Sequence, residues 1–241
     1  MFTQLKKISS SKNVIIYSDL FTILGEKKTR KEILNYILKA VNLLLKKKYT
    51  VILPSFNLNF PKTKVTGYST DFITTGYLNK FLISKMNFYR TAKPIYNYAV
   101  LGPNTQKILN LKQTTAWGED SVLGYLVRNN AAGLGFNINP NDFGWVVIHC
   151  CEEDMKVPYR FYKKFSGKNI DLNKSVFEKM YVRNLAVARD SDYTKIINLL
   201  SSKDIVVKKN KNLLVTTINL LNYYKIGISS LKKNTYFLFK K

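Results

Sequence analysis

Acidic residues, histidine and cysteine are all scarce in this chain of 241 residues. Its 15 aspartates and glutamates stand against 39 lysines and arginines, which gives a formal net charge of +24. Such an excess favours an anionic partner, such as nucleic acid, an anionic membrane surface or a ligand with phosphates. The lysines are spread over the whole chain, however, and form no single arm or stripe. We therefore do not expect nucleic acid as a partner.

The two cysteines, Cys150 and Cys151, are adjacent. Neighbouring cysteines rarely form a disulfide, and with only one histidine in the chain they do not complete a zinc site. No metal is expected, and reduced thiols fit a reducing cytosol. Long apolar runs are missing as well, and residues 1–13 lack the apolar core of a signal peptide. The expectation is a cytoplasmic protein without a membrane span.

Hydrophobic residues make up 46% of the chain, which is typical of a globular protein. Residues 14–17 and 50–53 are short runs that favour strands, and between them apolar residues recur with helical spacing from Ile33 to Leu45. The spacing of Thr29 and Glu32 is that of a capping box before this helix. Strand, helix and strand predict a parallel βαβ unit, in which ligands bind beyond the carboxyl ends of the strands.

The remaining patterns add further elements to this unit. We predict a surface loop at residues 60–73 and helices at 78–86, 120–127 and 190–200. We also predict a strand at 98–101, an apolar run at 131–136 and a hairpin at 205–215. No repeat or linker interrupts them. The predicted fold is a single α/β domain over residues 1–241, with a mainly parallel central sheet, flanking helices and antiparallel additions.

One stretch of the chain has the pattern of a catalytic base. The run from Trp145 to Ile148 favours a strand and leads to His149, the only histidine. Glu152 and Glu153 follow at i+3 and i+4, so on a helix these carboxylates share the face of the imidazole. A carboxylate fixes the tautomer of a histidine and stabilises its cation, as a general base requires. A lone histidine after a strand is often structural, and the pattern alone leaves both interpretations open.

Five segments, taken in order, match motifs of one known family. They are residues 14–20 with Leu24 and Gly25, residues 50–56, residues 90–102, residues 118–121 and residues 149–152. They are similar to the VLVHSSL…LG, TLVMPTF, R-S-x-H-P-x-H-S-x-x-x-x-G, G-x-x-S and H-x-x-E segments of the aminoglycoside N(3)-acetyltransferase family, also called the antibiotic N-acetyltransferase family. The chain therefore resembles a divergent member of this family over most of its length.

The resemblance implies direct transfer of an acyl group from acetyl-CoA, or another acyl-CoA, to an amine of a sugar. It implies His149 as the general base and Glu152 as its partner, with Glu153 a solvated companion. Predicted contacts of the acyl-CoA are Ser18, Asp19, Leu20, Gly25, Ser55, Arg90 and Ser121. Predicted contacts of the acceptor are Lys93, Tyr96 and Asn97, which replace histidines and a serine of the family motif.

Several alternatives stay open for these residues. Ser18, Asp19 and Ser55 are also ordinary turn residues, and Arg90 could pair with an acidic neighbour instead of a phosphate. Backbone N–H groups near Ser55 or Ser121 are candidate oxyanion donors. In a rival mechanism, Cys150 or Cys151 is the nucleophile that carries the acyl group.

The charge of the chain bears on the acceptor. Aminoglycosides are polycations, which a protein of charge +24 repels. The expected acceptor is therefore an amino sugar that is nucleotide-linked or part of a bacterial surface glycan pathway. The alternatives are an aminoglycoside antibiotic, which would make the protein a resistance enzyme, and a non-enzymatic binder of anionic glycan or nucleic acid. The sequence specifies neither the acyl chain length nor the oligomeric state, and a homodimer is compatible with it.

Overall fold

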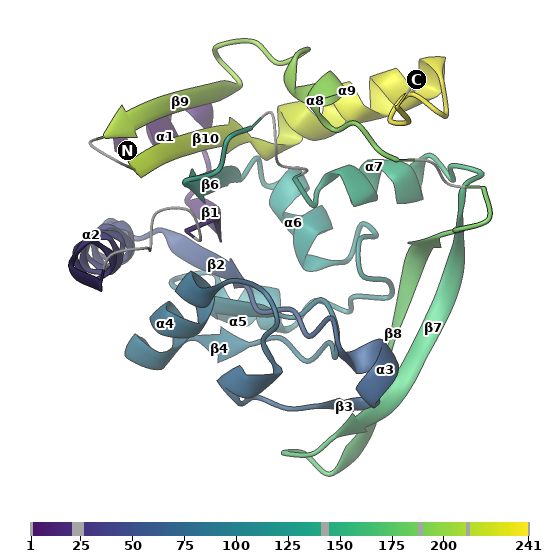
Figure 1. The fold of residues 1–241 in the computed structure, drawn as a ribbon, viewed down its shortest axis with the longest axis horizontal. Coiled ribbons are helices and arrows are strands. Elements are labelled where there is room, and N and C mark those ends of the chain that lie inside the picture. Colours follow the sequence, from purple (N-terminus) through teal and green to yellow (C-terminus); the bar gives the residue numbers. More distant parts are fainter. Residues whose placement is uncertain (1, 21–26, 141–144, 188–189, 211–212, 241) are drawn as a thin grey trace.

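Within the residues that the computed structural model describes, namely 2–20, 27–140, 145–187, 190–210 and 213–240, seven strands form a central sheet (Figure 1). Their order is β4-β5-β2-β1-β6-β10-β9. The middle of the sheet is parallel and consists of β1 (Asn13–Ser18), β2 (Thr50–Pro54) and β6 (Ala132–Phe136). The strands expected at residues 14–17 and 50–53 and the apolar run at 131–136 thus meet as the core of an α/β fold.

Antiparallel strands extend the sheet at both sides. On one side are β4 (Tyr89–Arg90) and β5 (Tyr98–Leu101), and on the other β9 (Ile205–Asn210) and β10 (Leu213–Asn219). The predicted hairpin of residues 205–215 is therefore confirmed, and β10 continues it to Asn219. The predicted α/β class is also confirmed, and within the central sheet β2-β1-β6 are the strands that pair parallel.

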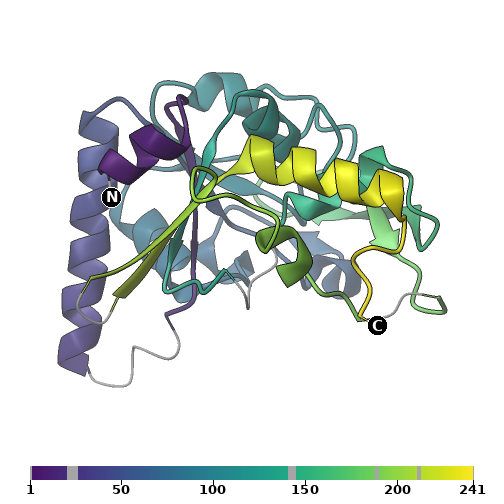
Figure 2. The same ribbon diagram turned by 90° about the horizontal axis from the view of Figure 1, so that it is seen from above.

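The alternation of β1 side chains separates two hydrophobic cores. Val14 and Ile16 pack with the first core, which involves α1 (Phe2–Ile8), α2 (Lys27–Lys46) and α4 (Tyr77–Lys85). Ile15 and Tyr17 pack with the second, which involves α6 (Val122–Arg128), α7 (Ile148–Asp154), α8 (Thr194–Ile197) and α9 (Leu220–Lys233), together with Ile108 of α5 (Thr105–Leu109). Figure 2 shows α2 at one edge of the molecule and α9 running away from it toward the C-terminus.

A second, three-stranded sheet lies beside the first. It consists of β3 (Val65–Thr66), β7 (Arg160–Asn169) and β8 (Lys174–Arg183), in the order β3-β7-β8. β7 and β8 pair antiparallel over ten positions, from Arg160 opposite Arg183 to Asn169 opposite Lys174. Figure 1 shows this ribbon running along one side of the molecule, from the neighbourhood of α7 to β3. The sequence analysis assigned no element to this stretch.

Some predictions about local structure were wrong. Residues 60–73 form α3 (Phe60–Thr63), β3 and the 3-10 turn η1 (Thr70–Phe72) instead of a loop, because elements of two to four residues are too short to show a period. α2 already includes Lys27, before the capping-box position Thr29. α8 has four residues and ends before Leu199 and Leu200.

The run before His149 is not a strand either. The N–H groups of Ile148, His149 and Cys150 donate to the carbonyls three residues earlier, at 2.9 to 3.0 Å. Trp145 and Val147 are buried in the second core without being part of a strand, and the Trp145 ring packs edge-on against Tyr17 of β1 at 5.3 Å. The apolar run reflects burial, and α7 begins at Ile148, so the condition under which His149 and the following carboxylates share a helical face is met.

Candidate active site

α7 places His149 and Glu152 on one face, three residues apart. Glu152 Oε2 lies 2.7 Å from His149 Nδ1. The Glu152 side chain is fully buried, whereas 19% of the His149 side chain is exposed. The contact leaves Nε2 as the ring nitrogen that can take a proton from a ligand.

Arg160, the first residue of β7, lies beside both members of this pair. Its Nη2 lies 2.8 Å from Glu152 Oε2 and 3.2 Å from His149 Nδ1, and its Nη1 donates to the Tyr181 carbonyl at 3.0 Å. A guanidinium only donates, and Nδ1 cannot both donate to Glu152 and accept from Arg160. The contact with Glu152 is the shorter one, so Nδ1 carries the hydrogen and donates it to the Glu152 carboxylate. Arg160 was not predicted as a site residue, since no local pattern marks an arginine at the start of a strand as buried.

The charges of the site favour a neutral histidine beside an ionised glutamate. Burial lowers the pKa of His149, and the hydrogen bond and charge of Glu152 offset only part of this effect. Burial by itself would raise the pKa of Glu152, but the hydrogen bond and charge of His149 and the guanidinium of Arg160 outweigh it, so that its pKa lies below the usual value. A neutral imidazole held by a carboxylate is the state that a general base needs.

One aromatic ring contacts the imidazole, and a second packs on that ring. The Trp117 ring centroid is 4.8 Å from that of His149, and the Tyr96 ring meets Trp117 edge-on at 5.2 Å. Tyr96, predicted as an acceptor contact, is thus connected to His149 through one ring. Lys93 is half-buried, and its Nζ lies 5.8 Å from the Phe177 ring centroid.

A second polar cluster lies at the carboxyl end of β2. Ser55 Oγ donates to Asn97 Oδ1 at 2.6 Å, Arg90 Nε donates to the same oxygen at 2.8 Å, and Arg90 Nη2 donates to the Ser55 carbonyl at 3.1 Å. Burial lowers the pKa of Arg90 to about 10. Among the described residues, no carboxylate lies within ion-pair distance of Arg90. Asn97, predicted to contact the acceptor, is itself buried by this cluster.

The other predicted contacts of the acyl-CoA are dispersed. Ser18 ends β1, and Asp19 N donates to the Phe136 carbonyl at 3.0 Å. Leu20 is buried in the core on the opposite face of the sheet from α7. Ser121 is buried and caps α6, accepting from Gly124 N at 3.0 Å. Gly25 lies outside the described residues.

The backbone donors expected at Ser55 and Ser121 already have acceptors. Ser55 N donates to the Asn97 carbonyl at 3.0 Å, and Ser121 N donates to the Gly118 carbonyl at 2.9 Å. Neither of these two N–H groups is free for an oxyanion, because Ser55 N bonds across to the chain beside β5 and Ser121 N bonds within its own turn.

Glu153 is not the solvated companion that was expected. Only 3% of it is exposed, and its Oε1 accepts from Thr115 Oγ1 at 2.6 Å and from Tyr162 OH at 3.3 Å. Burial raises its pKa. The correction has a tertiary cause, because the side of α7 that carries Glu153 is covered by the loop of Thr115 and by β7.

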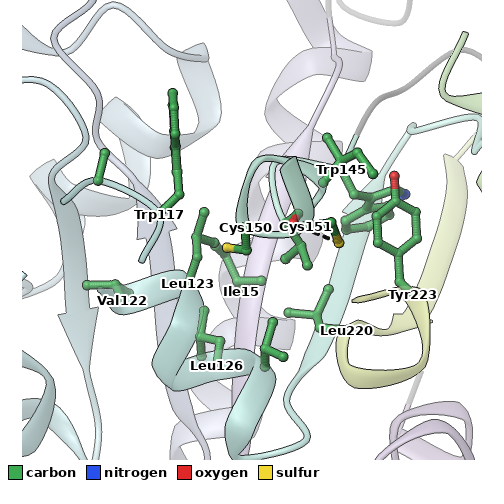
Figure 3. Close-up of a cluster of buried hydrophobic side chains, with 14 of the residues drawn as sticks. Ile15, Trp117, Val122, Leu123, Leu126, Trp145, Cys150, Cys151, Leu220 and Tyr223 are labelled. Atoms are coloured by element: carbon green, nitrogen blue, oxygen red, sulfur yellow. Dashed lines mark hydrogen bonds between the residues drawn. The ribbon is translucent and has the colours of Figure 1, made fainter. Parts of the chain in front are cut away.

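The two thiols do not fit the rival mechanism. Cys150 and Cys151 are buried in the cluster shown in Figure 3, together with Trp145 and Leu220. Burial raises the pKa of both thiols well above the ordinary value. A thiol that stays protonated and buried is a poor nucleophile.

In the described part of the chain, no group of three or more His, Cys, Asp and Glu side chains could hold a metal ion. No helix among the described residues is long and apolar enough to cross a bilayer.

Comparisons with known proteins show which family and which solved structures the chain resembles. A family model described as aminoglycoside 3-N-acetyltransferase matches residues 40–226. The structure of AAC-VIa bound to sisomicin has 13% sequence identity and a TM-score of 0.71, covering 96% of this chain and 95% of that one. A histidine-to-alanine mutant of the aminoglycoside acetyltransferase AAC(3)-IVa, in complex with apramycin, has 14% identity and a TM-score of 0.69, covering 97% and 90%. YokD protein from Bacillus subtilis has 15% identity and a TM-score of 0.69, covering 95% and 89%. No curated protein sequence matches the chain.

The fold and the family match define an acyltransferase. Enzymes of the matched family use acetyl-CoA. The chain belongs to the aminoglycoside 3-N-acetyltransferase family. The resemblance noted in the sequence is thereby confirmed. The family match also favours the aminoglycoside alternative over the expected acceptor from a glycan pathway.

Proposed function

We propose that the protein transfers the acetyl group of acetyl-CoA to an amine of an aminoglycoside, with His149 as the general base. The observation that carries the proposal is the contact between His149 Nδ1 and the buried Glu152 carboxylate at 2.7 Å. It fixes the tautomer in which Nε2 has the lone pair, and it places a negative charge beside the imidazolium that forms on protonation.

His149 Nε2 takes the proton of the amine while the nitrogen forms its bond to the thioester carbonyl carbon. The C–S bond breaks, and CoA leaves as the thiolate. A base of this kind contributes about 10² to 10⁴-fold, and positioning of the reactants supplies much of the remaining acceleration. Arg160 does not take part in proton transfer; it keeps Glu152 ionised and orients it.

Residues at the carboxyl ends of β1 and β2 would hold the acetyl-CoA, which supplies the activated acyl group. Ser18 ends β1, and Ser55 and Arg90 lie at the end of β2. Arg90 has its charge beside carbonyl and amide oxygens and not beside a carboxylate. An arginine without an acidic partner fits a phosphate, for which its planar group of donors is suited.

The net charge of the chain is compatible with a cationic ligand, because one pocket has an acidic lining, although His149 is not among its lining residues. The pocket has a volume of about 450 Å³ and lies beside α7. Four carboxylates line it with two cationic side chains, namely Glu119, Asp120, Glu153, Asp154, Arg128 and Lys156. The pocket thus has an excess of carboxylates in a chain of charge +24. The repulsion expected from the composition does not apply uniformly over the surface.

The test is release of free thiol from acetyl-CoA with a panel of aminoglycosides and nucleotide-linked amino sugars. We expect release with aminoglycosides, and its loss in His149→Ala. Thermal unfolding and calorimetric binding of acetyl-CoA serve as controls that the variant is folded and binds the co-substrate. Release with nucleotide-linked sugars alone would replace the proposed acceptor, and undiminished release in His149→Ala would remove His149 from the mechanism.

A further inference from the structure

Strand β8 supports the surroundings of His149 at three positions, Glu178, Lys179 and Tyr181. The Glu178 carboxylate, which is fully buried, accepts from Ile95 N at 2.7 Å and from Tyr96 N at 3.1 Å, both through Oε2. The Lys179 carbonyl accepts from Ala116 N at 2.9 Å. The Tyr181 carbonyl accepts from Arg160 Nη1 at 3.0 Å.

These supports converge on one group of side chains. Glu178 holds the backbone of Tyr96, and Lys179 holds the backbone beside Trp117. The two rings meet at 5.2 Å, and Trp117 contacts His149 at 4.8 Å. A shift of residues 95 and 96 would therefore reach the imidazole through two ring contacts.

We propose that Glu178 is a positioning residue of the active site, which holds residues 93–97 so that Tyr96 packs against Trp117 beside His149, and which makes this arrangement sensitive to pH. The inference rests on the proposed function only in identifying the His149 site as the catalytic one. Glu178 itself does not contact His149 in any described interaction and has no part in proton transfer.

The charge of Glu178 is what distinguishes this support from an ordinary hydrogen bond. A neutral side chain could accept the two N–H groups without placing a charge in the interior. Burial raises the pKa of Glu178 to about 7, while the two backbone N–H groups and Lys93 act in the opposite direction. The other titratable groups that interact with it are Tyr96 and Tyr98, which burial keeps protonated by raising their pKa values, that of Tyr96 to about 12. Lys93 is thus the one cation among the described residues that acts on Glu178.

Protonation of Glu178 near pH 7 weakens its hydrogen bonds with Ile95 N and Tyr96 N and its attraction to Lys93. Hydrogen bonds to a charged acceptor are stronger than those to a neutral one. The attraction to Lys93 disappears with the charge. The hold on residues 93–97 is therefore tightest above pH 7 and loosens as the pH falls through this value.

The test uses two variants of the full chain. Glu178→Gln keeps one acceptor oxygen but has no charge, and Glu178→Ala removes the acceptor. Lys174→Ala, at the exposed end of the same strand, is the matched control. Trp117 and Trp145 are the only tryptophans of the chain, so intrinsic fluorescence reports on the Trp117 contacts without requiring activity. A His149→Asn background excludes quenching by the imidazolium.

We expect a fluorescence transition with a midpoint near pH 7 in chains that contain Glu178 and none in Glu178→Gln. In the transfer reaction at pH 8, Glu178→Gln should keep KM within about twofold. Glu178→Ala, which leaves the N–H groups of Ile95 and Tyr96 without their acceptor, should raise KM about tenfold. Unchanged fluorescence and KM in Glu178→Ala would overturn the positioning role, and a transition that persists in Glu178→Gln would overturn the pH dependence. Should Glu178→Ala not fold, the fluorescence titration of Glu178→Gln still decides, and it does so whether or not acetyl transfer is found.

Discussion

Arg160 Nη2 lies 2.8 Å from Glu152 Oε2, inside the protein and almost out of contact with water. The two residues come from different elements, β7 and α7, so the ion pair joins the hairpin to the helix that carries the catalytic base. A buried carboxylate is costly to desolvate, and this cost is offset only while its partners remain in place.

Replacing Arg160 should therefore destabilise the fold. Arg160→Met leaves the buried carboxylate of Glu152 without its guanidinium, and we expect a loss of about 3 to 5 kcal/mol in the free energy of unfolding. The matched control is Arg128→Met, because Arg128 forms an exposed pair with Glu119 at 3.7 Å, and pairs of that kind contribute about 0 to 1 kcal/mol. Urea unfolding measures both. Equal losses in the two variants would contradict the buried pair.

The ionisation of His149 can be followed directly, since it is the only histidine of the chain. We expect its imidazole NMR signals to titrate with a midpoint below the ordinary histidine value of 6.5, because burial lowers its pKa. Glu152→Gln should lower the midpoint further, because it removes the charge that favours the cation. A midpoint at or above 6.5 in the unaltered protein would contradict the burial argument.

The same shift has consequences for activity and stability. Between the lowered midpoint and pH 6.5 the unfolded chain binds a proton that the folded chain does not, so this contribution to stability is lost as the pH falls through that range. The value of kcat/KM should fall over the same range as the base becomes protonated. The measurement is best made in Glu178→Gln, where the second titration near pH 7 is absent.

The role of Ser121 can be tested, because a helix N-cap and a contact with acetyl-CoA have different effects when the residue is replaced. Its Oγ accepts from Gly124 N at 3.0 Å at the start of α6. Ser121→Ala should reduce the free energy of unfolding by about 1 kcal/mol, as the loss of an N-cap does, and leave KM for acetyl-CoA unchanged. Ser55→Ala, at the cluster of Arg90 and Asn97, should raise this KM. A raised KM in Ser121→Ala would restore the predicted contact with the cofactor.

The packing of α9 on α7 depends on Gly227. A Cβ at this position would lie 2.6 Å from Cys151 Sγ. Alanine favours a helix over glycine by about 1 kcal/mol, but we expect Gly227→Ala to destabilise by about 1 to 3 kcal/mol because the core is overfilled. Cys151→Ala should suppress the effect in a double-mutant cycle and keep acetyl transfer. Additive losses would show that the clash is relieved elsewhere.

Much of the parallel centre of the sheet could be predicted from the sequence, because β1 and β2 are short continuous apolar runs and the helix between them has one clear period. The β7-β8 ribbon could not. Most of its β7 side chains are exposed, including aromatic ones such as Phe161, and neither strand shows a clean alternation of apolar and polar residues. Its stability comes from pairing with a partner strand and from contacts with β3 and α7, which a local pattern does not contain.

The site divides in the same way. His149 and Glu152 share one helical face, and their spacing alone predicts their contact. Arg160 and Glu178 reach the site from another element, so their importance follows from packing and not from spacing. Glu153 shows the converse case, because the polar residue expected to face solvent is covered by a loop whose position the sequence does not reveal.

The ribbon also sets a rule for changes in chain length. Successive side chains of a strand point to opposite faces, and on β8 the buried residues Glu178 and Met180 share one of them. Inserting one residue between Lys174 and Glu178 would turn the carboxylate outward and an exposed neighbour inward, whereas inserting two would preserve its direction. Additions within the turn at residues 170–173 leave the paired register untouched. Length variants of this segment should therefore divide into tolerated and inactive ones according to whether the change within β8 is even or odd.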